Sequence, residues 1–406
     1  MECPYVKKCG GCNHINDGYE KHLKILENKE RKLLKKHGVV HEIQKMNYPY
    51  HYRNKVTASF GYEKGKIIAG TYQENSHRIV NIDGCIIENK KADEIIATIK
   101  KLAVSFKIKI YNEDTGYGLL RHVMVRYGHN TNEYMVVLIL SSTMFPSKNN
   151  FVKALLKEHP EITTVVMNIN NQKTSMILGE RSQTIYGKGY INDKLCGINY
   201  RLSPESFYQI NSSMTEKLYK KAIELADLKS SDKVIDAYSG IGTIGMTAAK
   251  KAGSVIAVEL NETAVKDAIK NARHEKINNI RFVHGDAGKF MDSYKEAVDV
   301  VFMDPPRAGS SKEFLDSIVR LAPKRVVYIS CNPETLDRDL KYLEKREYKV
   351  DGIWPYDMFP FTEHVETVCL LSNTQRPKKE SYITLDVEME DYYRIKNEGK
   401  NSNTGK

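Results

Sequence analysis

Residues 234–245 read Val234-Ile235-Asp236-Ala237-Tyr238-Ser239-Gly240-Ile241-Gly242-Thr243-Ile244-Gly245. The run begins as an apolar strand, passes through a glycine-rich turn and continues as a helix, an order typical of nucleotide-binding α/β proteins. Glycines at such a turn let the backbone approach a ligand closely. This stretch therefore predicts an α/β fold with a ligand site where the strand meets the helix.

Buried strands and amphipathic helices alternate regularly after about residue 215. The expected strands are 233–237, 254–259, 280–284, 298–303 and 325–330. Such alternation predicts a parallel, doubly wound sheet.

The chain before this sheet has a different pattern. Strand-like runs at 53–60, 67–72 and 134–140, with helices at 19–36 and 92–106, indicate a smaller α+β region on an antiparallel sheet. We therefore predict four parts: 1–91 with a cysteine cluster and the start of an accessory domain, 92–205 with the rest of that domain, 206–375 with the large α/β domain, and 376–406 as a partly disordered tail.

Charge and composition limit the function classes. Lys and Arg number 62 against 51 Asp and Glu, a formal net charge of +11, which favours a polyanionic partner such as RNA. The N-terminus has no signal-peptide pattern and the chain has no apolar run long enough to span a bilayer. We expect a cytoplasmic monomer with no membrane partner.

An acidic residue completes the predicted ligand site. Glu259 ends the next strand, nineteen residues beyond Gly240, where a carboxylate can accept hydrogen bonds from both hydroxyls of a ribose. A structural turn without a ligand and a dinucleotide site are the alternatives. The residues before the turn, Asp236 to Ser239, are more typical of methyltransferases, so we favour S-adenosylmethionine.

Two further segments follow strands of the same sheet, where ligands of open α/β proteins bind. They read Met303-Asp304-Pro305-Pro306-Arg307-Ala308-Gly309 and Tyr328-Ile329-Ser330-Cys331-Asn332-Pro333. Asn332 is expected to cap a helix that starts at Pro333, and the positive end of that helix would favour a Cys331 thiolate. The alternative is a small buried cysteine at a strand end.

A thiolate beside a methyl donor suits the chemistry of uracil. Carbon 5 is a weak nucleophile until a thiolate adds to carbon 6, and a base must then remove the carbon 5 proton. Glu366 is the candidate base. It lies in Phe359-Pro360-Phe361-Thr362-Glu363-His364-Val365-Glu366.

Taken together, the segments around Asp304, Cys331 and Glu366 resemble the bacterial RNA 5-methyluridine (uracil-C5) methyltransferase family, especially its ribosomal RNA branch. Ser206-Phe207-Tyr208-Gln209-Ile210-Asn211 also looks like that family's entry into the catalytic domain. The resemblance implies a Rossmann-like class I methyltransferase domain that acts on an unpaired uridine, most plausibly of 23S ribosomal RNA.

The resemblance also implies roles for single residues. Cys331 matches the nucleophile and Glu366 the base that takes the carbon 5 proton. Residues that match contacts to S-adenosylmethionine or the target base are Gln209, Tyr238, Glu259 and Asp304. Thr243 stands where many members have asparagine.

Seven cysteines suggest no disulfide framework. Cys3, Cys9, Cys12 and Cys85 could hold a cubane iron-sulfur cluster or a tetrahedral zinc, or two of them could form a redox pair. Similarity to the ribosomal RNA branch implies a [4Fe-4S] cluster on these four. Cys196 and Cys369 lie in apolar runs and are expected in the core.

Relatives commonly carry a β-barrel of oligonucleotide-binding type before the cluster, whereas here the first candidate ligand is residue 3. RNA affinity is therefore expected from basic stretches such as Lys7-Lys8, Arg31-Lys32, Lys35-Lys36 and the run through Arg53 and Lys55. Two other functions stay open: methylation of transfer RNA, and a redox-sensing RNA-binding protein without catalysis.

Overall fold

The computed structural model describes residues 2–74 and 76–375 of the 406-residue chain. Residues Met1–Asn373 form one compact unit, to which every helix and strand below belongs. The predicted tail, 376–406, lies outside the described residues.

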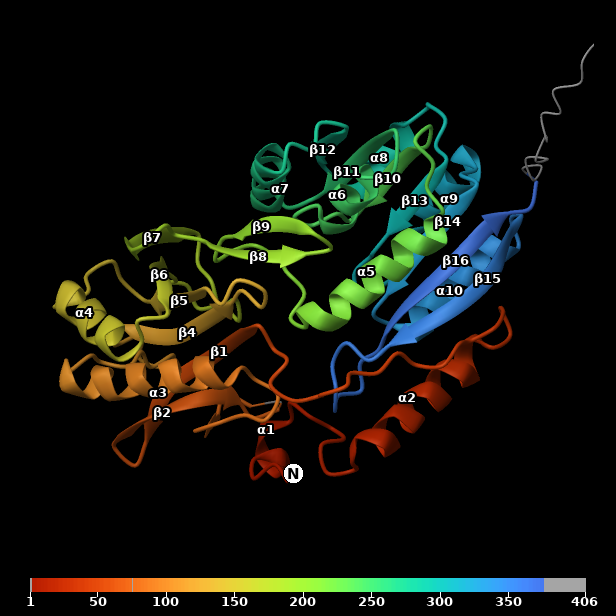
Figure 1. The fold of residues 1–406 in the computed structure, drawn as a ribbon. Helices are drawn as coiled ribbons and strands as arrows, with labels where there is room; N and C mark the ends of the chain where they lie inside the picture. Colours follow the sequence, from red (N-terminus) through yellow and green to blue (C-terminus); the bar gives the residue numbers. More distant parts are fainter. Residues whose placement is uncertain (1, 75, 376–406) are drawn as a thin grey trace, which may run out of the picture. The chain divides into compact units, whose positions relative to one another are not determined.

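The C-terminal part is built on a mixed sheet in the order β12-β11-β10-β13-β14-β16-β15 (Figure 1). Its strands are β10 (Lys233–Ala237), β11 (Ser254–Glu259), β12 (Ile280–His284), β13 (Val300–Met303), β14 (Arg325–Ser330), β15 (Tyr348–Tyr356) and β16 (Glu366–Asn373). Strands β10 to β14 are parallel, whereas β16 runs antiparallel to both β14 and β15. The predicted parallel sheet is confirmed, although β13 begins two residues later than expected.

Helices cover both faces of this sheet, because successive strand residues point to opposite sides. In β10, Val234 joins the core on one face and Ile235 the core on the other. The helices of the first face are α5 (Ser212–Ala226), α6 (Thr243–Ala249) and α7 (Glu262–His274), and those of the second are α8 (Ala287–Ser293), α9 (Lys312–Leu321) and α10 (Pro333–Glu344). This double winding leaves the carboxyl ends of the parallel strands available for ligands.

The accessory region has a second sheet, in the order β3-β2-β1-β4-β5-β6-β7. Its strands are β1 (Lys55–Glu63), β2 (Lys66–Tyr72), β3 (Ile79–Asn81), β4 (Leu120–Tyr127), β5 (Tyr134–Leu140), β6 (Ile162–Ile169) and β7 (Arg181–Tyr186). The prediction of an antiparallel sheet is wrong for one pair, since β5 and β6 are parallel. The unpredicted helix α4 (Lys148–Glu158) carries the chain back between them, as a parallel connection requires.

The accessory sheet shares a core with the α/β part. One of its faces packs against α3 (Lys90–Ser105) and α4. From the other face, Met124 and Val137 enter the apolar core that also contains α5 and the hairpin of β8 (Ile191–Leu195) and β9 (Ile198–Leu202). Burial of apolar surface, worth about 25 cal/mol per Å², therefore holds the two sheets together.

Two cysteines were predicted in the core. Cys369 is fully buried on β16, as expected. The prediction for Cys196 is confirmed only in part, because this residue forms the β8–β9 turn with φ +50° and is partly exposed, although it packs against the core of the first face. The following Gly197 was the turn signal in the sequence.

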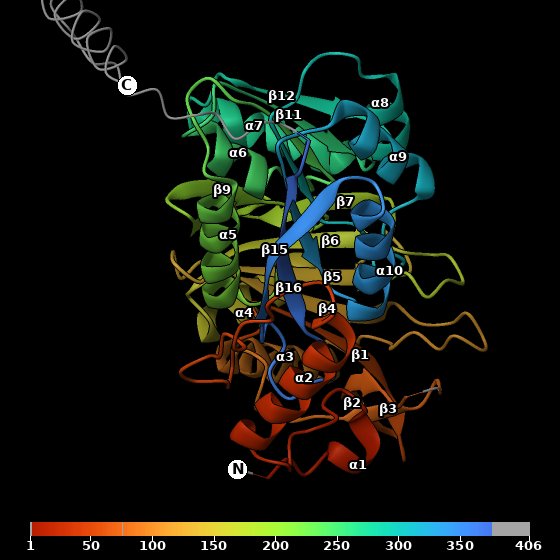
Figure 2. The same cartoon turned by 90° about the vertical axis from the view of Figure 1, so that its right-hand side faces the viewer.

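The N-terminal segment returns to the catalytic part of the chain. After α1 (Val6–Cys9), helix α2 (Tyr19–Leu34) packs against α10 and β15, as the red and blue ribbons show in Figures 1 and 2. His41 N–H then donates to the Ile353 carbonyl at 2.8 Å and Gln44 N–H to that of Pro355 at 2.9 Å. Residues far apart in the sequence thus lie next to the loop that leads into β16.

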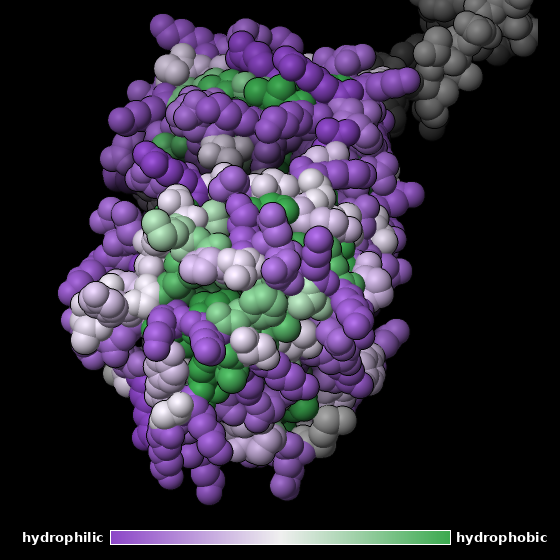
Figure 3. Space-filling view, turned by 90° about the vertical axis from the view of Figure 1, so that its left-hand side faces the viewer, coloured by the Kyte–Doolittle hydropathy of each residue, from purple (hydrophilic) through white to green (hydrophobic). Residues whose placement is uncertain are grey.

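Hydrophilic residues cover most of the face shown in Figure 3, with hydrophobic residues gathered across its middle. No helix within the described ranges is long and apolar enough to cross a membrane.

The docking of α2 can be tested by denaturation. Leu34 is fully buried in the core of the second face, so Leu34→Ala should lower the free energy of unfolding by about 2–5 kcal/mol. Ile25 on the same helix is 37% exposed and serves as the matched control, with a loss below about 1 kcal/mol for Ile25→Ala. Equal urea midpoints for the two variants would show that α2 is not docked as described.

Candidate active site

A cavity opens at the carboxyl end of β10, beside the glycine turn. Three of the four predicted donor-site residues, Gln209, Tyr238 and Asp304, line it. Its other walls are Leu195, Phe207, Tyr208, Thr215, Tyr219, Ser239, Gly240, Ile241, Thr243 and Ile244. The structure therefore brings together residues from four separate stretches of the chain.

The turn needs its glycines. Gly242 has φ +78°, and a Cβ there would lie 2.6 Å from the Phe282 ring. A Cβ on Gly245 would lie 2.8 Å from Oδ2 of Asp236, which accepts the Gly245 N–H at 2.7 Å. Gly240 has φ +56° and nothing within 4 Å of a Cβ position, so its backbone faces open space where a ligand can approach.

Glu259, the fourth predicted donor-site residue, holds this turn in place. Its Oε2 accepts the Gly240 N–H at 2.8 Å and its Oε1 accepts the Asn261 N–H at 2.8 Å. Each carboxylate oxygen has a second lone pair, so both can still accept a hydroxyl. The predicted contact with ribose hydroxyls stays a prediction.

Polar atoms near the cavity lack partners within the protein. Among the described residues, the Asp236 Oδ1 and Ser239 Oγ atoms are buried without a hydrogen bond. Burial raises the pKa of Asp236 to about 8. Buried polar groups normally find a partner, so these two atoms fit a site that binds a polar ligand.

Cys331 and Glu366 meet through the pairing of two strands. In the antiparallel ladder of β14 and β16, Ser330 stands opposite Thr367. One residue further along each strand, Cys331 and Glu366 face each other at the edge that carries the donor cavity. Glu366 is 5% exposed, whereas Cys331 is half-buried.

The expected cap of the next helix is confirmed, but its effect on the thiol is not. The Asn332 side chain accepts the Glu334 N–H at 3.0 Å and Pro333 begins α10. Even so, burial, then the charges of Glu366 and Asp304, raise the pKa of Cys331 to about 11. Burial and these neighbouring acids therefore work against the thiolate that the sequence predicted at the start of α10.

A cluster of acids surrounds the thiol. Burial raises the pKa of Glu366 well above its ordinary value, and the Asp304 carboxyl adds to the rise because like charges repel. Burial likewise raises the pKa of Asp304. Arg307 opposes these shifts at both Glu366 and Cys331, and its Nη2 lies 3.1 Å from His364 Nε2. Sequence reasoning quoted Arg307 in a motif but gave it no role.

The accessory sheet positions the segment before α5. The Asn54 side-chain amide donates to the Gln209 carbonyl at 2.8 Å, and the buried Arg126 donates to the Ser206 carbonyl at 2.7 Å. Gln209 thus reaches the donor cavity on a segment that residues of the accessory region hold.

The four N-terminal cysteines gather around a small separate core. Cys3, Cys12 and Cys85 pack against Ile15, Tyr52, Ile87 and Phe361, and Cys9 interacts electrostatically with Cys3. Burial raises the pKa of both Cys12 and Cys85 to about 12. Within residues 2–74 and 76–375 no group of three or more His, Cys, Asp or Glu is arranged to hold a metal ion. The structure therefore shows no metal site.

A positively charged side chain, Arg53, lies near these cysteines, where it could neutralise an anionic group that they bind. Arg53 acts electrostatically on Cys9 and Cys12, and its Nε is buried without a hydrogen-bond partner. Lys55 is also half-buried, and burial lowers its pKa to about 8. Arg53 and Lys55 are therefore only partly accessible, and their contact with RNA stays a prediction.

Comparison with known proteins identifies the family. A sequence model described as tRNA (Uracil-5-)-methyltransferase matches residues 21–374. A Halalkalibacterium halodurans protein described as an uncharacterized RNA methyltransferase is 40% identical over 377 residues, which cover 91% of this chain and 82% of that protein. A Caldanaerobacter subterraneus protein with the same description is 41% identical over 380 residues, covering 91% and 83%. The chain belongs to the RNA uracil-5-methyltransferase family.

A solved structure supports the fold and the donor. The tRNA (uracil-54, C5)-methyltransferase of Pyrococcus abyssi, in complex with S-adenosyl-L-homocysteine, has a TM-score of 0.74 and 29% identity, and the match covers 87% of this chain and 83% of that one. The protein is thus an S-adenosylmethionine-dependent RNA methyltransferase with a Rossmann-like α/β fold, as predicted.

The state of the Cys331 thiol can be measured by alkylation. With a pKa near 11, its rate with iodoacetamide should rise about tenfold per pH unit from pH 7 to 9, because the thiolate fraction does so. Arg307→Met should slow alkylation at each pH by about threefold or more, because a positive charge that lowers the pKa is lost.

Cys196 provides the internal reference for mass spectrometry, since burial also raises its pKa to about 11 and Arg307 does not act on it. A Cys331 rate that is fast and constant below pH 8 would contradict the burial argument.

Proposed function

We propose that the protein methylates carbon 5 of an unpaired uridine in 23S ribosomal RNA, with Cys331 as nucleophile and Glu366 as base. The register of β14 against β16 carries this proposal, since it sets a thiol and a carboxyl side by side next to the donor cavity. The ribosomal target rests on the motifs around Asp304 and Cys331 and on the cysteine spacing.

In the proposed reaction, the Cys331 thiol first gives its proton to solvent water, and the thiolate then adds to carbon 6 of uracil while the electron pair of the carbon 5–carbon 6 double bond moves toward carbon 5. Carbon 5 then takes the methyl group, with S-adenosylhomocysteine as the leaving group. Glu366 removes the carbon 5 proton, and the thiolate departs as the double bond reforms. Every bond made to Cys331 is thus broken again.

The acids around Cys331 suit this sequence of steps. When the pKa of a carboxyl group is raised, it lies closer to neutral pH, and the group can both take up and release a proton more readily than an ordinary glutamate. Arg307 opposes the rise in pKa at both Cys331 and Glu366. Its positive charge therefore favours the charged forms of these two groups when the uracil ring is bound. Gln209, Tyr238, Glu259 and Asp304 would hold the donor or the uracil ring.

Transfer RNA is the second candidate substrate. The matching family description and the Pyrococcus abyssi enzyme both name tRNA. Mapping 5-methyluridine in ribosomal and transfer RNA from cells with and without the gene separates the two. Loss of the modification from 23S RNA alone supports the proposal, whereas loss from transfer RNA alone replaces it.

Glu366→Gln should separate methyl transfer from release. Addition and methylation can proceed, but carbon 5 keeps its proton, so a covalent methylated protein–RNA adduct should accumulate while free product falls by at least about 100-fold. Denaturing gels with labelled donor detect the adduct. The double variant that adds Cys331→Ala is the control and should form none. Free methylated RNA at the normal rate from Glu366→Gln would exclude Glu366 as the base.

For the N-terminal cysteines we propose a [4Fe-4S] cluster on Cys3, Cys9, Cys12 and Cys85. Four thiolates give such a cluster a net negative charge, which the positive charge of Arg53, acting on Cys12, would offset. The cluster would fix the N-terminal segment near Phe361, in the loop before Glu366.

Protein purified without oxygen should therefore be brown, with about four irons per chain. Cys9→Ser or Cys85→Ser should lose the colour, whereas Cys196→Ser, which changes a hairpin turn, should keep it. A colourless protein with one zinc per chain would contradict the assignment.

A further inference from the structure

A second cavity of about 870 Å³ lies on the accessory sheet, away from Cys331. Its walls come from β1 and β2, from the residues between β2 and β3, and from the loops at 111–114 and 173–177. In Figure 2 the orange and yellow-green loops on the right-hand side belong to these last two stretches. A cavity of this size holds a ligand such as a nucleotide.

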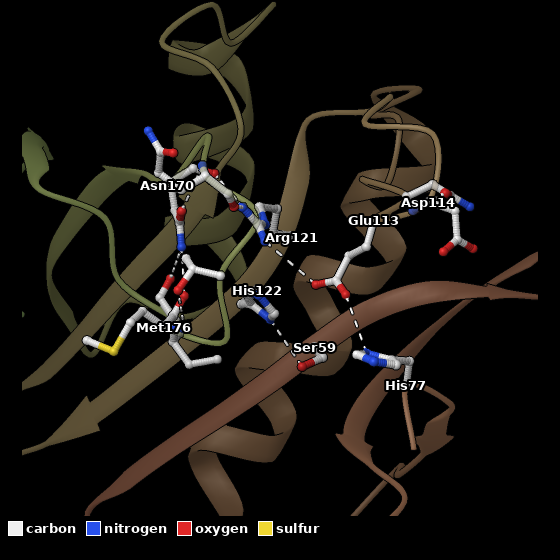
Figure 4. Close-up of polar contacts among 12 residues, drawn as sticks. Ser59, His77, Glu113, Asp114, Arg121, His122, Asn170 and Met176 are labelled. Carbon is white, nitrogen blue, oxygen red and sulfur yellow. Dashed lines mark hydrogen bonds and ion pairs between the residues drawn. The ribbon is translucent and has the colours of Figure 1, made fainter. Parts of the chain in front are cut away.

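A buried arginine forms the polar centre of this cavity (Figure 4). Arg121 is 3% exposed and donates through Nη1 to the carbonyls of Asn170 and Gln172, both at 2.8 Å. Its Nη2 lies 3.6 Å from a Glu113 oxygen, and its Nε is buried without a partner. These contacts hold the guanidinium in a fixed position at the cavity wall, where its positive charge can attract the polar edge of a ligand.

The neighbouring histidine is neutral. His122 Nδ1 lies 3.1 Å from Ser59 Oγ, and burial, then the charge of Arg121, lower the pKa of His122 to about 4. A neutral imidazole offers one donor and one acceptor. With the Glu113 carboxylate as acceptor, the cavity presents both kinds of group, as the edge of a nucleobase requires.

Aromatic rings complete the walls. Tyr62, Tyr72 and Tyr111 line the cavity, and the Arg121 guanidinium lies 4.5 Å from the centre of the Tyr111 ring. Tyr62 is 51% exposed. Tyrosine rings at a cavity wall, one of them exposed, provide flat surfaces on which unpaired bases stack.

The accessory sheet connects this cavity to the active site. On the same face, Ser59 pairs with His122 and Lys55 pairs with Arg126. Arg126 in turn donates to the Ser206 carbonyl, one residue before Phe207, which lines the donor cavity. Four residues of strand span roughly 14 Å. That length matches roughly four stacked nucleotides of one RNA strand.

We propose that this cavity binds an unpaired nucleobase of the substrate RNA, several nucleotides from the target uridine. This inference rests on the proposed function, because it assumes that a uridine occupies the site at Cys331. The base stacks on the tyrosines and bonds its edge to Arg121, His122 or Glu113. Because this base and the target uridine bind at two fixed places, the contact in this cavity determines which uridine of the RNA reaches the Cys331 thiol.

Binding of RNAs of two lengths tests the inference. Fluorescence anisotropy would compare 15-nucleotide and 5-nucleotide single strands, each with one central uridine and mixed A, C and G flanks. The variant Tyr72→Ala/Tyr111→Ala should weaken binding of the long RNA by about tenfold and leave the short RNA unchanged. Tyr117→Ala is the matched control, since this tyrosine is 84% exposed and does not line the cavity.

A photoreactive thio-base in the flank should crosslink wild-type protein to peptides that contain Tyr111 or His122. Unchanged thermal unfolding and S-adenosylhomocysteine affinity show that the double variant folds, and Glu113→Gln gives a second, milder probe of the same wall. Equal binding of the long RNA by all variants, or crosslinks confined to other peptides, overturns the inference. Absence of 5-methyluridine formation by the wild type would instead overturn the proposed function, since the binding assay needs no turnover.

Discussion

The antiparallel pairing of β16 with β14 is the constraint on which the candidate active site depends. A fully parallel sheet would place the carboxyl ends of all its strands at one edge, but β16 begins at that edge instead of ending there. Its first residue, Glu366, therefore comes to lie opposite the residue that follows β14, Cys331. A one-residue slip of β16 would turn the Glu366 side chain to the other face of the sheet and separate acid from thiol.

Burial sets the chemistry of this pair. Asp304, Cys331 and Glu366 each have a raised pKa because burial disfavours their charged forms, and neighbouring acids add to the rise at Cys331 and Glu366. Arg307 opposes the rise in pKa at both Cys331 and Glu366. Helix α2 and the loop before β16 help to keep these side chains buried. Glu30 on α2 accepts a hydrogen bond from Thr367 next to Glu366 at 3.0 Å, and Phe361 packs in the core beside the N-terminal cysteines.

Much of this could be predicted from the sequence where local signals are strong. Short apolar runs between amphipathic helices, together with the glycine turn, predicted four of the five parallel strands residue for residue, and the Asn332-Pro333 pair predicted the helix start. Tertiary effects could not be predicted in this way. The weak amphipathic pattern of α4 hid the parallel pair β5–β6. The charge on Cys331 depends on Asp304 and Glu366, which are distant in sequence, and the half-buried state of Arg53 depends on packing against the cysteine core.

The central claim is that Cys331 bonds to carbon 6 of the target uracil, and that Glu366 removes the proton from carbon 5 after methyl transfer. RNA in which the target uridine carries fluorine at carbon 5 tests it directly, because fluorine cannot leave as a proton does and the intermediate is trapped. Mass spectrometry of the digested complex should find one peptide, the one that contains Cys331, joined to a methylated fluoro-dihydrouridine. An adduct on another residue, or methylation without any adduct, would contradict the account.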